Sequence, residues 1–344
     1  MKQITKYFTG TLLCFSIALP AWFLGKAFPI AGGPVFGILA GMALSMTLPR
    51  LLCNHALGLE EGVKFTSKSL LQVSIILLGF GMNLFHVLEV GRQTLYVIFF
   101  TLSASFLAAY FAGKALQLDG KMTVLIGVGT SICGGSAIAA TAPVICAKDE
   151  DVAHSISTIF LFNVLAVFIF PALGNSLGMS DTGFGMWAGT AINDTSSVVA
   201  SATAWSEAAG NDAALGFATV VKLTRTLMIV PVTLFLAVYT AAKTEINEGQ
   251  KCGRAFQVLK IFPWFVLGFV AASVFNTFWG VPPLSGALVA AGKFMIVMAM
   301  AAIGLKTNLP RLLTNGFKPI LTGLCCWVSV AGVSLLVQKL SGTW

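Results

Sequence analysis

Long apolar runs alternate with short polar connections along almost the whole chain. Each run approaches or exceeds the roughly 20 residues that a helix needs to cross a bilayer. The runs lie at about 7–25, 30–49, 65–85, 93–117, 121–146, 153–178, 182–208, 213–240, 258–279, 284–306 and 315–338. This pattern predicts an all-α polytopic membrane protein with about 9–11 transmembrane segments. We expect a single membrane domain over residues 1–344, in which 7–25 is an extra, uncleaved N-terminal span.

Two polar interruptions of this apolar pattern resemble each other. They are Gly129–Ala140 and Gly189–Ala200, runs of small and hydroxyl residues inside longer apolar segments. Five residues are identical at one fixed offset: Gly129/Gly189, Thr130/Thr190, Ile132/Ile192, Ser136/Ser196 and Ala140/Ala200. Two copies of a glycine-interrupted polar segment in a hydrophobic chain are typical of a transport site built from two half-helices.

A second internal similarity indicates that the duplication is inverted. Leu78–Leu84 ends the third run and Ile303–Leu309 ends the tenth, with Gly79/Gly304, Asn83/Asn308 and Leu84/Leu309 in common. The two runs are seven apart in chain order, so they cross in opposite directions. We therefore predict an inverted repeat, with 30–178 as the first copy and 182–338 as the second.

The chain can pass through the two polar interruptions in two ways. Each segment either crosses the membrane as a broken helix or enters and leaves on one side as a re-entrant hairpin. If both segments are hairpins, the one that contains Gly129 enters from the cytoplasm and the one that contains Gly189 enters from outside. In both cases, non-helical backbone at this depth must be buried in protein or line a polar cavity.

Composition and charge support a membrane location. Hydrophobic residues make up 57% of the chain and charged residues 10%, against about 25% charged residues in soluble domains. The formal net charge is +8. We attribute it to basic residues in cytoplasmic loops rather than to nucleic-acid binding, which places the N-terminus in the cytoplasm and the C-terminus outside.

The sequence contains no pattern that indicates an enzyme or a metal site. GxSxG, HExxH and P-loop motifs are absent, and the seven cysteines have neither CxxC nor metal-ligand spacing. Most cysteines lie in apolar runs, where we expect them to act as small apolar residues without a structural disulfide. We therefore expect no catalytic residues, cofactor or metal, apart from a coupling ion, H⁺ or Na⁺.

The first polar interruption offers hydroxyl groups around a glycine pair. Thr130, Ser131, Cys133 and Ser136 surround Gly134–Gly135. Adjacent glycines cost about 1 kcal/mol each against alanine in a helix, so a break is expected here. A break frees backbone N–H groups, and the positive end of the next half-helix can face an anion. The alternative is that these small residues serve close helix packing.

The second interruption adds a carboxylate. Asn193–Asp194 stands where the first copy has Cys133–Gly134, with Thr190, Ser196 and Ser197 beside it. A charge at membrane depth costs roughly 2.5–3.5 kcal/mol on insertion scales. Asp194 is therefore expected to carry a proton, bind a cation or organise an anion site. The structural alternative is a buried ion pair or a helix cap.

Two cations follow on the next segment. Lys222 and Arg225 lie three residues apart, on one helix face. We expect one to pair with Asp194 and the other to bind an anionic substrate, for which arginine offers bidentate geometry. Alternatively, both lie at the membrane interface. Lys293 is a weaker candidate near a segment end, and Asn163 is placed to bond a carbonyl of a broken helix or to form an ordinary interhelical bond.

The residues of these segments resemble those of a known family. At Gly129–Phe162 and Gly189–Arg225 the sequence resembles the bacterial inner-membrane sulfate exporters of the YeiH type. The matching stretches are Ser131–Ile138, Trp187–Asp194 and Val221–Arg225. Members of that family often have His where this chain has Asn193. More distantly, the chain is similar to the bile-acid and cation/proton antiporter superfamily.

The resemblance implies a panel domain and a core domain that move in alternating access, with two broken helices crossing at the substrate site. It also implies that Asn193–Asp194 occupies the place of an antiporter ion site. We expect a multi-pass protein of the bacterial inner (plasma) membrane. The expected partners are the lipid bilayer, a small anionic solute and, as a homodimer, a second copy of the chain; nucleic acid is not expected.

The function that these observations predict is secondary active transport of a small anion, such as sulfate or an organic sulfonate or carboxylate. The expected midplane site consists of Thr130, Ser131, Cys133, Gly134, Gly135, Ser136, Thr190, Asn193, Asp194, Ser196, Ser197, Lys222 and Arg225. One alternative is a cation/proton antiporter that uses Asn193–Asp194. The other is a membrane partner or sensor that transports nothing.

Overall fold

The computed structural model describes residues 2–28, 32–47, 59–244, 263–307 and 316–344. Within these residues all regular structure is helical, and every expected apolar run contains helix where it is described, with breaks inside 121–146 and 182–208. Seven helices are long and apolar enough to cross a membrane. The prediction of an all-α polytopic membrane protein is confirmed, whereas the inverted repeat stays a prediction.

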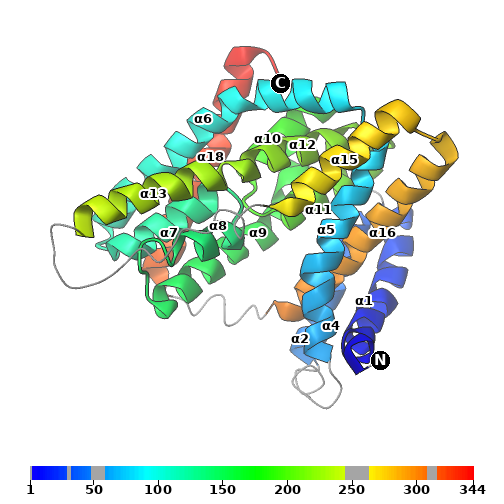
Figure 1. Ribbon diagram of the computed structural model, residues 1–344, viewed down its shortest axis with the longest axis horizontal. Helices are drawn as coiled ribbons and strands as arrows, with labels where there is room; N and C mark the ends of the chain where they lie inside the picture. Colours follow the sequence, from blue (N-terminus) through cyan, green and yellow to red (C-terminus); the bar gives the residue numbers. More distant parts are fainter. Residues whose placement is uncertain (1, 29–31, 48–58, 245–262, 308–315) are drawn as a thin grey trace.

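The helices form two bundles that lie side by side (Figure 1). The smaller one, here called the panel, is built from two separate stretches of the sequence, one within 2–81 and one within 264–306. It contains α1 (Lys2–Ala27), α2 (Gly33–Thr47), the nearly continuous helix α4–η2–α5 (Leu59–Phe65, Thr66–Leu70, Leu71–Leu78) with its final turn η3 (Gly79–Gly81), α15 (Trp264–Trp279) and α16 (Pro282–Lys306).

The larger bundle, here called the core, holds both polar interruptions. Its uninterrupted helices are α6 (Leu84–Ala115), α9 (Asp149–Ser176), α12 (Ala213–Leu227), α13 (Ile229–Thr244) and α18 (Phe317–Ser341). The interrupted segments form two pairs of short helices, α7 (Gly120–Ser131) with α8 (Gly135–Thr141) and α10 (Asp181–Ala191) with α11 (Thr195–Ala209).

Each interrupted segment folds back on itself at its break. In the first, Lys121 Nζ at the start of α7 donates to the carbonyl of Cys146, beyond the end of α8, at 2.6 Å. In the second, Trp205 near the end of α11 donates through Nε1 to Asp181 at the start of α10, at 2.7 Å. Because both ends of each segment lie together, the breaks at 132–134 and 192–194 are the tips of two helical hairpins.

Small residues allow the panel helices to pack with their backbones close together. A Cβ on Gly41 of α2 would lie 2.3 Å from the carbonyl oxygen of Ala301 in α16, and one on Gly304 would lie 2.3 Å from that of Ile38. Such close approach is typical of helix pairs in membranes. The panel is therefore a tightly packed unit against which the core lies.

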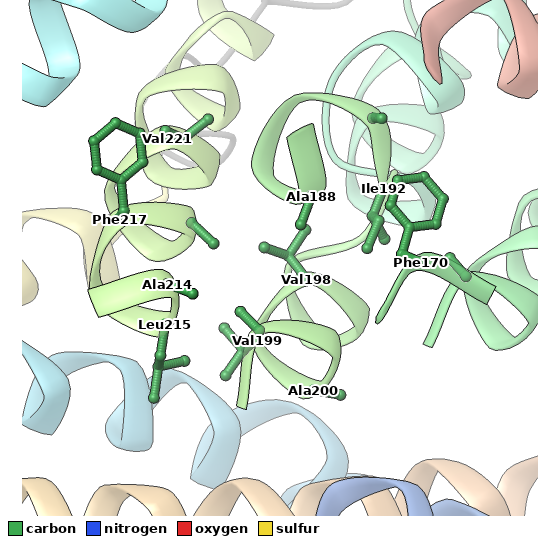
Figure 2. Packing of buried hydrophobic residues seen from close by; sticks show 14 of the residues in the cluster. Phe170, Ala188, Ile192, Val198, Val199, Ala200, Ala214, Leu215, Phe217 and Val221 are labelled. Carbon is green, nitrogen blue, oxygen red and sulfur yellow. The ribbon is translucent and has the colours of Figure 1, made fainter. Parts of the chain in front are cut away.

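Helix α11 is the core helix that packs against α2 and α16 of the panel. Its other faces are covered by apolar side chains of α9, α10 and α12, as Figure 2 shows for Val198, Val199 and Ala200. Two polar contacts join the bundles near the C-terminal end of α11. Gly33 N–H donates to Glu207 Oε2 at 2.9 Å, and Lys293 of α16 pairs with Asp212 at 2.5 Å.

The cysteines differ from the sequence prediction at one position. Cys14, Cys133, Cys325 and Cys326 are free thiols. Cys14, Cys325 and Cys326 lie in apolar helices, and Cys133 lies buried in the tip of the first hairpin. Cys146, in contrast, is disulfide-bonded. The expectation of no disulfide is wrong here because Cys146 lies in the connection between α8 and α9, outside any apolar helix.

Candidate functional site

Lys222 lies where the two hairpin tips meet. Its side chain is completely buried, and Nζ donates to three carbonyl oxygens: Ile132 at 2.7 Å, Ile192 at 3.0 Å and Asn193 at 2.5 Å. An ammonium group has three N–H donors. All three are therefore used by the backbone of the two tips, one carbonyl from the first tip and two from the second.

Arg225, one turn further along α12, bonds the adjacent carbonyls in the same way. The guanidinium is also completely buried. Nε donates to Ser131 at 2.6 Å, and Nη1 donates to Thr190 at 2.5 Å and to Ile192 at 3.2 Å. Nη2 donates to the carbonyl of Thr130. Arg225 thus joins the last turn of α7 to the last turn of α10.

These contacts explain how two cations are tolerated in an apolar helix. The last carbonyls of a helix have no partner within it, and the C-terminal end carries a partial negative charge. Helices α7 and α10 both end at this point, and α12 supplies the two cations that satisfy their carbonyls. Buried charges require such compensation. Here backbone dipoles provide it, and no ion pair joins either cation to Asp194 within the described part of the chain.

Asp194 acts as the N-cap of α11. Its carboxylate accepts from the backbone N–H of Ser196 at 3.1 Å and from the Ser196 hydroxyl. The backbone N–H of Asp194 donates to Asn163 Oδ1 of α9 at 3.1 Å. Asn163 therefore does bond the backbone of the break, although it accepts from an N–H group instead of donating to a carbonyl. The helix cap that the sequence left open as an alternative is formed.

A cavity of about 520 Å³, here called the tip cavity, lies between the hairpin tips and the panel. Its core side is formed by the first residues of α8 and α11 and by α9. Its panel side is formed by α4–η2–α5, α15 and α16. The lining residues are Ser67, Lys68, Leu71, Gln72, Ile75, Gly135, Ser136, Ala139, Ile156, Ile159, Phe160, Asn163, Asp194, Thr195, Ser196, Phe265, Ile303 and Lys306.

The polar groups of the tip cavity come from both bundles. Lys68 and Lys306, both exposed, stand on the panel side, and Lys306 Nζ lies 3.5 Å from the Ser67 hydroxyl. Asp194 stands on the core side. The described lining therefore holds two ammonium groups against one carboxylate, together with hydroxyl and amide groups that suit hydrogen bonding to an oxyanion.

The thirteen residues expected at the site divide into two groups. Gly135, Ser136, Asp194 and Ser196 line the tip cavity. The others lie outside this lining and hold the tips together or pack behind them; they are Thr130, Ser131, Cys133, Gly134, Thr190, Asn193, Ser197, Lys222 and Arg225. For example, the hydroxyl groups of Thr190 and of Ser334 in α18 form a hydrogen bond of 2.6 Å. Asn193 is fully buried, and neither polar atom of its side-chain amide has a hydrogen-bond partner among the residues that the structure describes.

The sequence did not identify the panel half of the cavity. Lys68, Gln72 and Lys306 were not among the expected site residues, because lysines near the ends of apolar runs are explained by cytoplasmic loops. One signal was present in the sequence. Lys68 and Gln72 are four residues apart, on one face of a helix, and Lys306 lies inside the repeated Gly304–Leu309 stretch.

Comparisons with known proteins give a family and no activity. A family model described as "Conserved hypothetical protein 698" matches residues 9–323. A "UPF0324 membrane protein" of Streptococcus agalactiae is 49% identical over 340 residues, covering 97% of this chain and 98% of the relative. One of Fusobacterium nucleatum is 46% identical over 350 residues, with coverages of 97% and 98%. No solved structure matches the chain.

Proposed function

We propose that this chain, which belongs to the family described as conserved hypothetical protein 698, is a secondary transporter of a small anion in the bacterial inner membrane. One observation carries the proposal. The tip cavity joins both hairpin tips to the panel, and its described lining has two lysines for one carboxylate. A cavity with a positive balance and several hydroxyl groups attracts oxyanions such as sulfate, sulfonates or carboxylates.

The arrangement of the two bundles supports alternating access. The tip cavity lies at the N-terminal end of α11, and the polar contacts of Glu207 and Lys293 lie near its C-terminal end. Asp194 and Glu207 are separated by thirteen residues of this helix, or about 20 Å. Under the positive-inside rule, Lys68 and Lys306 are cytoplasmic. In this proposal the cavity is open to the cytoplasm while the far end is held closed.

Asp194 is the group in the lining that is suited to proton coupling. An anion that enters the cavity approaches a carboxylate that already accepts two hydrogen bonds from Ser196. We assign to Asp194, the carboxylate of the described lining, the uptake of a proton with the anion, which makes the transported charge smaller by one.

The test is anion flux into proteoliposomes that contain the purified protein, with radiolabelled sulfate, methanesulfonate and succinate as probes. Lys306→Ala and Lys68→Ala each remove one ammonium group from the cavity. We expect each to reduce flux at low anion concentration by about tenfold, which corresponds to about 1.4 kcal/mol of binding. Lys339→Ala, an exposed lysine at the end of α18, is the matched control and keeps the full rate.

Unchanged flux in both cavity variants would remove the tip cavity from the transport route. An absence of flux with all three probes would count against transport of these anions and favour the reading as a partner or sensor without transport.

One observation also favours cation/proton antiport. Asp194 is a carboxylate in the cavity lining and lies next to Asn193, whose side-chain amide has no hydrogen-bond partner within the described part of the chain. A pH-gradient dequenching assay with Na⁺, K⁺ and Li⁺ separates the two functions. Antiport dissipates the gradient when one of these cations is added as chloride, whereas anion transport responds to the anion and not to the cation.

A further inference from the structure

Three backbone carbonyls converge at the point where the hairpin tips meet. They belong to Ile132, Ile192 and Asn193, and each lies within 3.0 Å of one nitrogen atom, Lys222 Nζ. They come from the C-terminal ends of two half-helices. In transporters with broken helices, unwound carbonyls and the C-terminal ends of half-helices are the groups that coordinate a coupling Na⁺ ion.

We propose that Lys222 is a built-in cation, which occupies the place where the two helix ends would otherwise bind a Na⁺ ion, so that transport is not coupled to Na⁺ at this point. The ammonium group fits this role in number and direction. Its three donors meet three carbonyls, and the side chain is completely buried. It therefore has no donor left for a substrate anion.

Arg225 completes the occupation of the helix ends. Its guanidinium bonds the carbonyls of Thr130, Ser131, Thr190 and Ile192. Between them, the two cations bond six carbonyls of the tips. A free cation that entered here would find these oxygens taken and two fixed positive charges beside it, and like charges repel strongly in a buried environment.

Because Lys222 is part of α12, its ammonium group cannot dissociate from the helix ends as a free ion can. The chain tethers it one turn from Arg225, at the point where the tips of the two hairpins meet. Binding and release of an ion during a transport cycle would require this contact to break, which would leave the ammonium group buried without partners. The inference about coupling therefore rests on the proposed function, but the occupation of the helix ends by Lys222 does not.

The first test uses the unaltered protein in detergent. Its thermal unfolding is followed in NaCl, KCl and choline chloride at equal ionic strength. A ligand that binds the folded state and not the unfolded state stabilises it by RT ln(1 + [L]/Kd), so the unfolding midpoint rises with ligand concentration. We expect equal midpoints in the three salts. A midpoint that rises specifically with Na⁺, and does so equally in Asp194→Asn, would show an available Na⁺ site other than this carboxylate and overturn the proposal.

The second test removes the built-in cation. Lys222→Ala removes the ammonium donor from all three carbonyls, of which only that of Ile192 keeps a bond from Arg225. We expect a lower unfolding midpoint that rises again with methylammonium or Na⁺ and not with choline, which has no N–H donor. Lys121→Ala is the matched control, because Lys121 also donates to a carbonyl but is exposed; its midpoint should not respond to methylammonium. A Lys222→Ala protein as stable as the parent would overturn the proposal.

If Lys222→Ala does not fold, the salt comparison on the unaltered chain decides the question. Sulfate flux in Na⁺, K⁺ and choline media then tests the coupling, and the proposal expects equal rates. Flux that requires Na⁺ would overturn it. An absence of flux in every medium counts instead against the proposed function for sulfate, while the unfolding data still decide the role of Lys222.

Discussion

Asp194 combines a structural and a chemical role that one substitution can separate. The carboxylate caps α11 through Ser196 and also lines the tip cavity. Asparagine is about as good an N-cap as aspartate, whereas alanine at this position costs about 1 kcal/mol. The cap needs a side-chain oxygen, but proton uptake needs a titratable group.

We therefore predict that Asp194→Asn unfolds within about 0.5 kcal/mol of the parent protein, while Asp194→Ala loses about 1 kcal/mol. In proteoliposomes, anion flux through Asp194→Asn should no longer be accelerated by an imposed pH gradient. Unfolding curves and flux with and without the gradient measure the two effects. A pH-driven acceleration that survives in Asp194→Asn would show that another group carries the proton.

Gly134 shows why a single residue decides where the first hairpin turns. Its φ of 68° and ψ of −130° lie in a region that is open to glycine and strained for other residues. A Cβ there would meet its neighbours only at 3.5 Å, which is ordinary contact. The requirement for glycine is therefore conformational, not steric. Gly135, by contrast, is the first residue of α8 and has no positive φ.

At the scale of the hairpin, we predict that Gly134→Ala destabilises the protein by about 1–3 kcal/mol, the usual cost of a strained backbone conformation. Gly135→Ala is the matched control. A Cβ at this position is 4.0 Å from its nearest neighbour, and alanine is favoured over glycine in a helix by about 1 kcal/mol. Gly135→Ala should thus be neutral or stabilising. Equal losses in the two variants would place the turn elsewhere.

The same pair of glycines shows how far sequence reasoning reaches. Apolar runs and the repeated polar stretch located the helices and both breaks. The bilayer requires long apolar helices, a glycine pair interrupts the first segment, and the second segment repeats the polar pattern of the first. The pattern did not show which glycine turns the chain, since that depends on backbone angles. It also did not distinguish a broken span from a hairpin, which depends on contacts such as Trp205 with Asp181.

For the candidate site, the sequence identified the tips but not their partners. Asp194 and Ser136 were expected at the site and do line the cavity. Lys222 was expected either to pair with Asp194 or to bind the anion, and it bonds backbone carbonyls. The hydropathy pattern predicts that a cation within an apolar run is buried, but it does not predict which groups the cation contacts. Lys306 was assigned to a loop, because only the packing of the panel against α11 brings it to the cavity.

At the scale of the whole molecule, the two ends of the interface between the bundles differ. Near the C-terminal end of α11, Lys293 of the panel pairs with Asp212 of the core at 2.5 Å. Two cavities, of about 300 and 440 Å³, flank this pair and share both residues in their linings. In an alternating-access cycle the bundles must separate here before the tip cavity can open to the other side.

Reversing these two charges tests that separation. Lys293→Asp and Asp212→Lys each place like charges in contact, so each should open this end of the interface, while the double exchange restores the pair. Residue 206 lines the 300 Å³ cavity, so the readout is the rate at which an impermeant thiol reagent labels a cysteine introduced by Ser206→Cys. The protein without this substitution gives the background rate. We expect labelling several times faster in each single reversal and a return toward the starting rate in the double exchange.

Because a partly exposed ion pair contributes only about 0–1 kcal/mol, the free energy of global unfolding should change little in these variants. Labelling that is equally slow in all four proteins would mean that Lys293 and Asp212 do not hold the bundles together.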